Sequence, residues 1–139
     1  MKVLLSIKPE FADKIFDGSK QYEFRKSVYR SENIKTVVVY VTRPVGRIVG
    51  EFDVKEILCH SPEDLWQKTS HKAGISKDFF DSYFDGRTVS FALSVGKVRK
   101  YKNPIDPATL IDNFTPPQSY MYVDDALGRP SSTQMALAL

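Results

Sequence analysis

The chain has 139 residues, of which 42% are hydrophobic and 27% are charged. This balance is typical of one globular domain and excludes a disordered or fibrous protein. The single cysteine, Cys59, excludes an intramolecular disulfide, and with only two histidines beside it we expect no metal site. No run approaches the ~18 apolar residues of a membrane span, so we expect a cytoplasmic protein without a membrane partner.

Charge is unevenly distributed along the chain. Residues 1–102 contain 19 Lys and Arg against 13 Asp and Glu, a net charge of +6. Residues 103–139 contain 1 basic residue against 4 acidic residues, a net charge of −3. The basic part favours an anionic partner, although its charge excess is modest.

The first half of the chain predicts a strand, a helix and two further strands. The apolar residues 1–7 indicate a central strand, and residues 9–17 place their apolar side chains on one helical face. Residues 21–26 predict a strand because polar and aromatic residues alternate, and the Val-rich residues 36–42 predict another.

The second half predicts a long strand, two helices and a last strand. Residues 47–58 form the long strand, in which Gly50 marks a bulge or a close backbone approach. Two helices are expected to begin after Ser61 and Ser76, whose hydroxyls suit helix N-caps. The second helix carries an aromatic stripe that we expect in the core: Phe79, Phe80, Tyr83 and Phe84. Residues 88–98 predict the last strand.

The order of these elements favours an α+β fold with a largely antiparallel sheet that is curled or closed. The Pro-rich residues 103–117 suggest irregular structure, and residues 124–139 are expected to form a flexible tail. Tyr120, Tyr122 and Val123 form an apolar set, so we expect residues 116–123 to pack against the sheet.

One stretch, residues 18–26, concentrates charged and aromatic side chains. Glu23 and Arg25 are two apart on a predicted strand and therefore project from the same face, while Lys20 lies at the preceding turn. From the residues alone, an exposed ion pair beside a helix-ending glycine, worth under ~1 kcal/mol, explains this pattern more often than a site does. The GxGxxG and P-loop motifs are missing, so we expect no cofactor.

Four residues of this stretch match G-x-K-x-x-E-x-R, the motif of the ASCH domain, which is a member of the PUA-like superfamily: Gly18, Lys20, Glu23 and Arg25. Further matches resemble the subgroup described as predicted transcriptional regulators, and they lie at residues 5–9, 40–46, 50–51 and 116–120. The resemblance implies a small, mainly antiparallel β-barrel with flanking helices. It covers about residues 1–123, including a C-terminal packing segment, residues 103–123.

The resemblance also implies that the motif lines a cleft that binds RNA, a nucleotide or a modified nucleoside. Arg25 can place two donors on a phosphate or a base edge, and Glu23 can accept a hydrogen bond from an exocyclic amine. The ligand-binding residues that we expect are Lys8, Lys20, Glu23, Arg25, Tyr40, Thr42, Gln118 and Ser119.

Two other classes of function stay open. One branch of ASCH proteins hydrolyses the amide of N4-acetylcytidine with a lysine that matches Lys20, and ribonuclease activity is attributed to another relative. Lys20 and Glu23 would then be catalytic, although Glu23 stands where that branch has a threonine and residues 73–78 offer no counterpart of its glutamate. The third class is a regulatory protein-interaction module with an unknown protein partner, in which Trp66 could anchor the contact, although a core tryptophan is the more common case.

Overall fold

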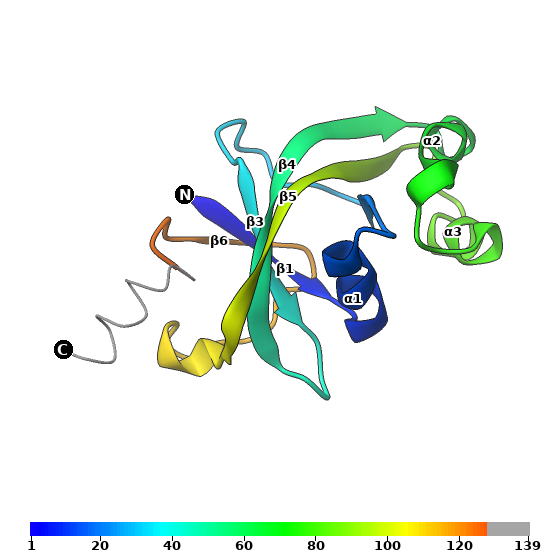
Figure 1. Ribbon diagram of the computed structural model, residues 1–139. Coiled ribbons are helices and arrows are strands. Elements are labelled where there is room, and N and C mark those ends of the chain that lie inside the picture. Colours follow the sequence, from blue (N-terminus) through cyan, green and yellow to red (C-terminus); the bar gives the residue numbers. More distant parts are fainter. Residues whose placement is uncertain (128–139) are drawn as a thin grey trace.

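A twisted six-stranded sheet forms the body of the protein in the computed structural model, which describes residues 1–127 (Figure 1). The strands lie in the order β2-β5-β4-β3-β1-β6. Their bounds are Lys2–Ile7 for β1, Tyr22–Arg25 for β2, Thr36–Val41 for β3, Arg47–His60 for β4, Ser90–Ile105 for β5 and Met121–Val123 for β6. The β1–β3 pair is parallel and the other neighbouring pairs are antiparallel. The predicted α+β class is confirmed.

The first helix, α1 (Pro9–Asp17), connects β1 to β2 and has the predicted bounds. Pro9 stands at its first position, where the missing N–H costs no hydrogen bond. Gly18 ends the helix with a φ of 88°, a left-handed conformation that glycine adopts without steric cost. The turn before β2 is therefore set by local sequence.

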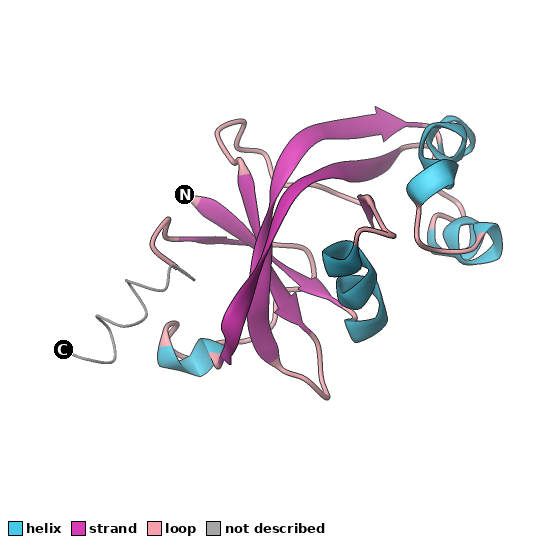
Figure 2. Ribbon diagram, viewed as in Figure 1, coloured by secondary structure: helices cyan, strands magenta, loops and turns pink. Residues whose placement is uncertain are grey.

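Two further helices, α2 (Pro62–Thr69) and α3 (Lys77–Tyr83), lie together at one end of the long β4–β5 ribbon (Figures 1 and 2). A short 3-10 helix, Ser70–Lys72, continues α2, and a second one, Pro107–Thr109, follows β5. The hydroxyls of Ser61 and Ser76 accept hydrogen bonds from backbone N–H groups of the first turns, so both predicted N-caps are confirmed.

The β4–β5 ribbon is longer than predicted, because β4 continues to His60 and β5 to Ile105. Its register shifts at three places, one of them between Ile48 and Gly50. Each shift moves the following side chains to the other face, which obscures the alternation on which a strand prediction depends. Both features predicted as alternatives at Gly50 are present: the register shifts beside it, and the backbone carbonyl of Arg99 approaches it closely.

We expect Gly50→Ala to destabilise the protein strongly. A Cβ at this position would lie 2.5 Å from the carbonyl oxygen of Arg99 and 2.8 Å from the ring of Phe16. Overpacking of this kind costs about 1–3 kcal/mol, and the backbone carbonyl has little room to move. Gly96→Ala is the graded control, because its Cβ would meet the Asp53 carbonyl at 3.0 Å. In equilibrium urea unfolding, the free energy of unfolding should be highest for wild type, lower for Gly96→Ala and lowest for Gly50→Ala.

The sheet is open. Of the two predicted forms, curled or closed, the closed one is wrong, and the β-barrel that the resemblance implies is not formed. Its edge strands, β2 and β6, do not pair with each other. They have four and three residues, and each is paired along one side only, β2 with β5 and β6 with β1. The side chain of Arg25 bridges this side of the sheet instead, because its guanidinium donates to the carbonyl oxygens of Ser6, in β1, and Ser119, just before β6.

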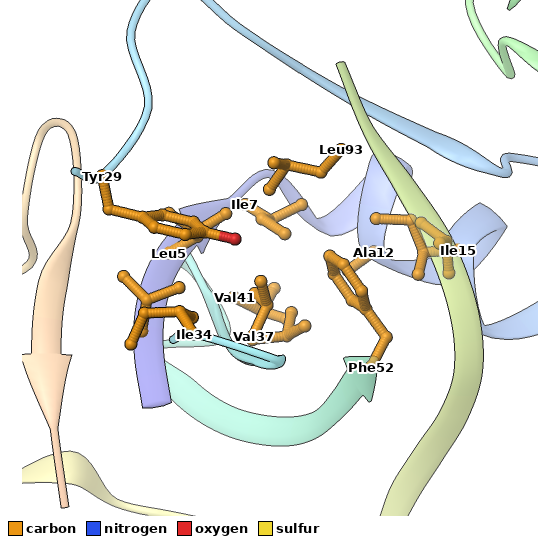
Figure 3. Close-up of a cluster of buried hydrophobic side chains, with 13 residues drawn as sticks. Leu5, Ile7, Ala12, Ile15, Tyr29, Ile34, Val37, Val41, Phe52 and Leu93 are labelled. Atoms are coloured by element: carbon orange, nitrogen blue, oxygen red, sulfur yellow. The ribbon is translucent and has the colours of Figure 1, made fainter. Parts of the chain in front are cut away.

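Both faces of the sheet are covered by apolar side chains. Figure 3 shows the largest cluster, in which α1 contributes Ala12 and Ile15 and the loop after β2 contributes Tyr29. A second cluster on the opposite face includes Leu4, Val38, Tyr40 and Ile48. A third joins β2 and β5 to α2 and α3. Cys59 is exposed on β4.

The C-terminal segment packs on the sheet as far as the structure describes it. β6 pairs with β1, Tyr120 packs against the first cluster, and the hydroxyl of Ser6 donates to the carbonyl oxygen of Pro117 at 2.9 Å. Leu127 is only 9% exposed, and its carbonyl oxygen accepts a hydrogen bond from Lys2. Of the flexible tail predicted over residues 124–139, residues 128–139 lie outside the described part of the chain.

Candidate functional site

A cavity of about 160 Å³ opens between the end of β1, α1, β2 and the helix α3. We call it the Lys20 cavity. Its apolar lining residues are Ile7, Phe11, Phe24, Ile75, Phe79 and Tyr83, and its polar ones are Ser6, Lys8, Lys20, Glu23 and Arg25. An apolar wall with a few converging polar groups is the usual composition of a small-molecule site.

Lys20 is a buried cation in this cavity. The residue is only 2% exposed, and its Nζ donates to the carbonyl oxygen of Ala73 at 2.9 Å. The same Nζ lies 4.6 Å from the ring centroid of Phe24 and 5.5 Å from that of Phe11. Only one of the three N–H donors has a protein acceptor within the described part of the chain. The other two are free to bind a ligand.

The loop before α3 closes over Lys20 because residue 74 is a glycine. Gly74 has a φ of +70°, and a Cβ there would lie 2.4 Å from the Cβ of Lys20. Hydrogen bonds hold the loop on both sides: Lys14 donates to the carbonyl of Gly74, and the N–H of Gln21 donates to that of Lys72. The burial of Lys20 therefore depends on a residue 54 positions away.

Burial lowers the pKa of Lys20 from 10.5 to about 8, because the desolvated ammonium loses its hydration. The charge of Glu23 opposes this shift, and that of Lys14 adds to it. Near neutral pH Lys20 is therefore mostly charged and can still exchange its proton. A cation with a strongly shifted pKa in a cavity is a typical mark of a functional site.

Glu23 and Arg25 form a buried pair, not the exposed ion pair that the pattern alone favours. Nη1 of Arg25 donates to Oε2 of Glu23 at 3.1 Å, and the side chains are 13% and 7% exposed. Arg25 also donates to the carbonyls of Ser6 at 3.3 Å and Ser119 at 2.7 Å. Oε1 of Glu23 has no donor among residues 1–127, so it can accept a hydrogen bond from a ligand.

Four of the predicted ligand-binding residues come together in the Lys20 cavity: Lys8, Lys20, Glu23 and Arg25. Ser119 contacts Arg25 through its backbone carbonyl, and both Ser119 and Gln118 are exposed. Thr42 donates its N–H to the carbonyl of Ile7 and does not line the cavity.

Tyr40 lies elsewhere. It belongs to the cluster on the opposite face of the sheet, where its ring is 5.0 Å from that of Phe114. It lines a second, wider depression of about 980 Å³, together with Arg43 and Arg47, which we call the Tyr40 depression. The Tyr40 hydroxyl has no hydrogen-bond partner among the residues that the structure describes.

The aromatic stripe of α3 divides into two pairs, and the prediction that all four are core is wrong. Phe80 and Phe84 are 0% and 2% exposed in the third cluster. Phe79 is 40% exposed and lines the cavity with Tyr83. Successive helical residues differ by about 100° in direction, so the two pairs face different surroundings. No spacing in the sequence connects these residues with Lys20.

Two general features of the described residues bear on the class of site. No group of three or more His, Cys, Asp and Glu side chains within residues 1–127 is arranged to hold a metal ion. In the same part of the chain, no helix has the length and apolar character needed to cross a membrane. Glu23 is the only carboxylate that lines the Lys20 cavity in the described chain.

Comparison with known proteins identifies the family. The ASCH domain profile matches residues 5–114, which is more than half of the chain. The chain belongs to the ASCH domain family. The ASCH domain-containing ribonuclease of Zymomonas mobilis is 28% identical over 144 residues, which cover 99% of this ASCH domain chain and 91% of the ribonuclease.

Solved structures share the ASCH fold. The crystal structure of ASCH from Zymomonas mobilis has a TM-score of 0.83 and 27% identity, and the match covers 99% of this chain and 94% of that one. The N-terminal domain of McrB from Staphylothermus marinus has a TM-score of 0.54 at 15% identity, so it shares the fold alone.

This ASCH domain also matches parts of longer proteins. Large ribosomal subunit protein uL22 of Ureaplasma parvum is 32% identical over 104 residues, 75% of this chain but 33% of uL22. The ATP synthase subunit alpha of the same species is 35% identical over 116 residues, 82% of this chain but 14% of that subunit. The chain thus spans a third or less of these relatives. Nothing in these matches supports the narrower resemblance to predicted transcriptional regulators.

Proposed function

We propose that this ASCH domain binds single-stranded RNA and takes one unpaired base into the Lys20 cavity. The observation that carries the proposal is a buried cation and a buried carboxylate, each with free hydrogen-bonding capacity, in an aromatic-walled cavity. Every nucleobase edge combines donors and acceptors, and RNA-binding proteins read such edges on bases that have left the stack.

The size and charge of the site support this ligand. Pockets for larger ligands measure about 300–1,000 Å³, and the Lys20 cavity, at about 160 Å³, suits a single ring system. The net charge of +6 over residues 1–102 favours the phosphate backbone that would remain outside. Arg25 acts here as a positioning residue, because its bonds to Ser6, Ser119 and Glu23 hold the carboxylate in place.

The proposal predicts a pH dependence of affinity. If the base accepts a hydrogen bond from the Lys20 ammonium, binding weakens as pH rises through the Lys20 pKa of about 8. Between about pH 7 and about pH 9 the charged fraction falls about tenfold, and so should the affinity. Fluorescence anisotropy with oligocytidylate at low salt measures this, because cytosine has no group that titrates in this range. A flat profile, or no binding at all, contradicts the proposal.

Cleavage of RNA is a second candidate function. It is favoured by the similarity, over 99% of this chain, to a protein named as a ribonuclease. Lys20, with a pKa of about 8, suits general acid–base catalysis near neutral pH. The Tyr40 depression is an alternative location, because it combines a free hydroxyl with two arginines that can bind phosphates.

Two variants distinguish these locations. End-labelled RNA incubated with the protein is resolved by gel electrophoresis, with Lys20→Met and Tyr40→Phe assayed in parallel. Loss of cleavage in Lys20→Met alone assigns catalysis to the Lys20 cavity, and loss in Tyr40→Phe alone assigns it to the Tyr40 depression. RNA that stays intact with wild type leaves binding as the function. Acetylcytidine hydrolysis stays a prediction. In this chain Lys20 donates a hydrogen bond to the backbone carbonyl of Ala73, in the loop that offers no counterpart of the hydrolase glutamate.

A further inference from the structure

The flank of α3 beside the cavity presents an aromatic surface that the fold does not bury. Phe79 is 40% exposed, and its ring is stacked with that of Tyr83, with centroids 6.5 Å apart and planes within 11°. The edge-on contact with Phe11, at 5.3 Å, joins this flank to α1 at the cavity mouth. Figure 1 shows α3 facing α1.

Two exposed lysines lie over these rings. Nζ of Lys8 is 5.9 Å from the centroid of Phe79, and Nζ of Lys26 is 4.9 Å from that of Tyr83. Lys8 precedes α1 and Lys26 follows β2, so the two cations approach α3 from different elements. An aromatic platform accompanied by flexible cations is how single-stranded nucleic acid is held without reading its sequence.

We propose that Phe79, with Lys8 and Lys26, forms a second subsite that stacks the nucleotide next to the one held in the Lys20 cavity. This inference rests on the proposed function. The neighbouring base takes the exposed face of Phe79, and the displaced Lys8 ammonium moves to the connecting phosphate. Lys26 binds the next phosphate along the strand. The cavity then selects one base, and the α3 flank adds affinity that depends on strand length.

For each variant the test measures the affinity of a five-residue oligocytidylate and that of cytidine monophosphate. Its readout is the ratio of the oligocytidylate affinity to the monophosphate affinity. One stacked base contributes about 1–3 kcal/mol, so Phe79→Ala should lower the ratio about tenfold, and Phe79→Trp should preserve it. Lys26→Gln should reduce the salt dependence of oligonucleotide binding by about 0.7 of a unit of log–log slope, the value for one phosphate contact on a single strand. Tyr122→Ala is the matched control, because Tyr122 is an aromatic residue of similar exposure (36%), and it should leave the ratio unchanged.

The outcomes separate the two proposals. If wild type binds neither ligand, the proposed function fails. If wild type binds both and the Phe79→Ala ratio equals that of wild type, the cavity stands and the α3 subsite is wrong. A ratio that falls equally in Tyr122→Ala also overturns the subsite, because the loss would then not be local to α3.

Discussion

Replacing Lys20 with methionine is expected to make the protein more stable near pH 7 and to weaken RNA binding. Lys20 is 2% exposed, and the pKa of its ammonium falls from 10.5 to about 8 on folding. A shift of this size corresponds to about 3 kcal/mol of destabilisation by the buried charge. Loss of the hydrogen bond to Ala73 costs about 1 kcal/mol, so the net gain is about 2 kcal/mol.

The pH dependence identifies the cause of this gain. Below about pH 8 both the folded and the unfolded wild-type chains carry the Lys20 proton, and the folded state bears the full desolvation cost. Between pH 8 and 10.5 the folded state has released that proton while the unfolded chain still holds it, so wild-type stability rises with pH. The advantage of Lys20→Met should therefore shrink over this range, as measured by urea unfolding at several pH values.

Binding should change in the opposite direction. A hydrogen bond to a charged group is worth about 1.5–3 kcal/mol, so Lys20→Met should weaken oligocytidylate binding about 10- to 100-fold. Lys100→Met is the matched control, because Lys100 is exposed on β5 and does not line the cavity. A Lys20→Met protein that is less stable than wild type at pH 7 and binds RNA normally would return Lys20 to a structural role.

Gly74→Ala is expected to open the loop over Lys20 and to destabilise the fold by about 3 kcal/mol. A Cβ would lie 2.4 Å from the Lys20 Cβ and 3.0 Å from its Cα, so the backbone must separate. Overpacking contributes about 1–3 kcal/mol, and a positive φ at a non-glycine residue adds about 1 kcal/mol or more. Water that enters the cavity should raise the pKa of Lys20 toward 10.5.

Gly86→Ala separates the two contributions. Gly86 has a φ of +76°, close to that of Gly74, but its Cβ would meet nothing within 4 Å. This control should show the backbone cost alone and leave the pKa of Lys20 at about 8. An NMR titration of the lysine side-chain resonances, with Lys20 assigned through the Lys20→Met variant, measures the pKa in each protein. An unchanged Lys20 pKa in folded Gly74→Ala would show that the loop does not keep water from Lys20.

Local sequence was sufficient to predict the bounds of α1 and to place Glu23 and Arg25 on the same face of β2. Proline at the first helical position and glycine at the end act within a few residues, and alternation along β2 is a property of any strand. Longer elements were less predictable. Three register shifts obscured the extent of the β4–β5 ribbon, and β6, with three residues, forms only because β1 offers it a partner.

The candidate site, too, was predictable from the sequence only in part. The motif at residues 18–25 indicated by itself which cations and which carboxylate belong together, because all of them lie in one turn and one strand. Only the tertiary structure buried Lys20, since the closing loop depends on Gly74, 54 residues away. Only the tertiary structure shows that Tyr40 lies on the opposite face of the sheet and that Phe79 lines the cavity. The reason is that the elements packed against a strand or helix decide which of its faces is buried. The sequence by itself thus determined which charged groups the Lys20 cavity contains, and the packing of distant segments decided how far these groups are desolvated and which residues wall the cavity.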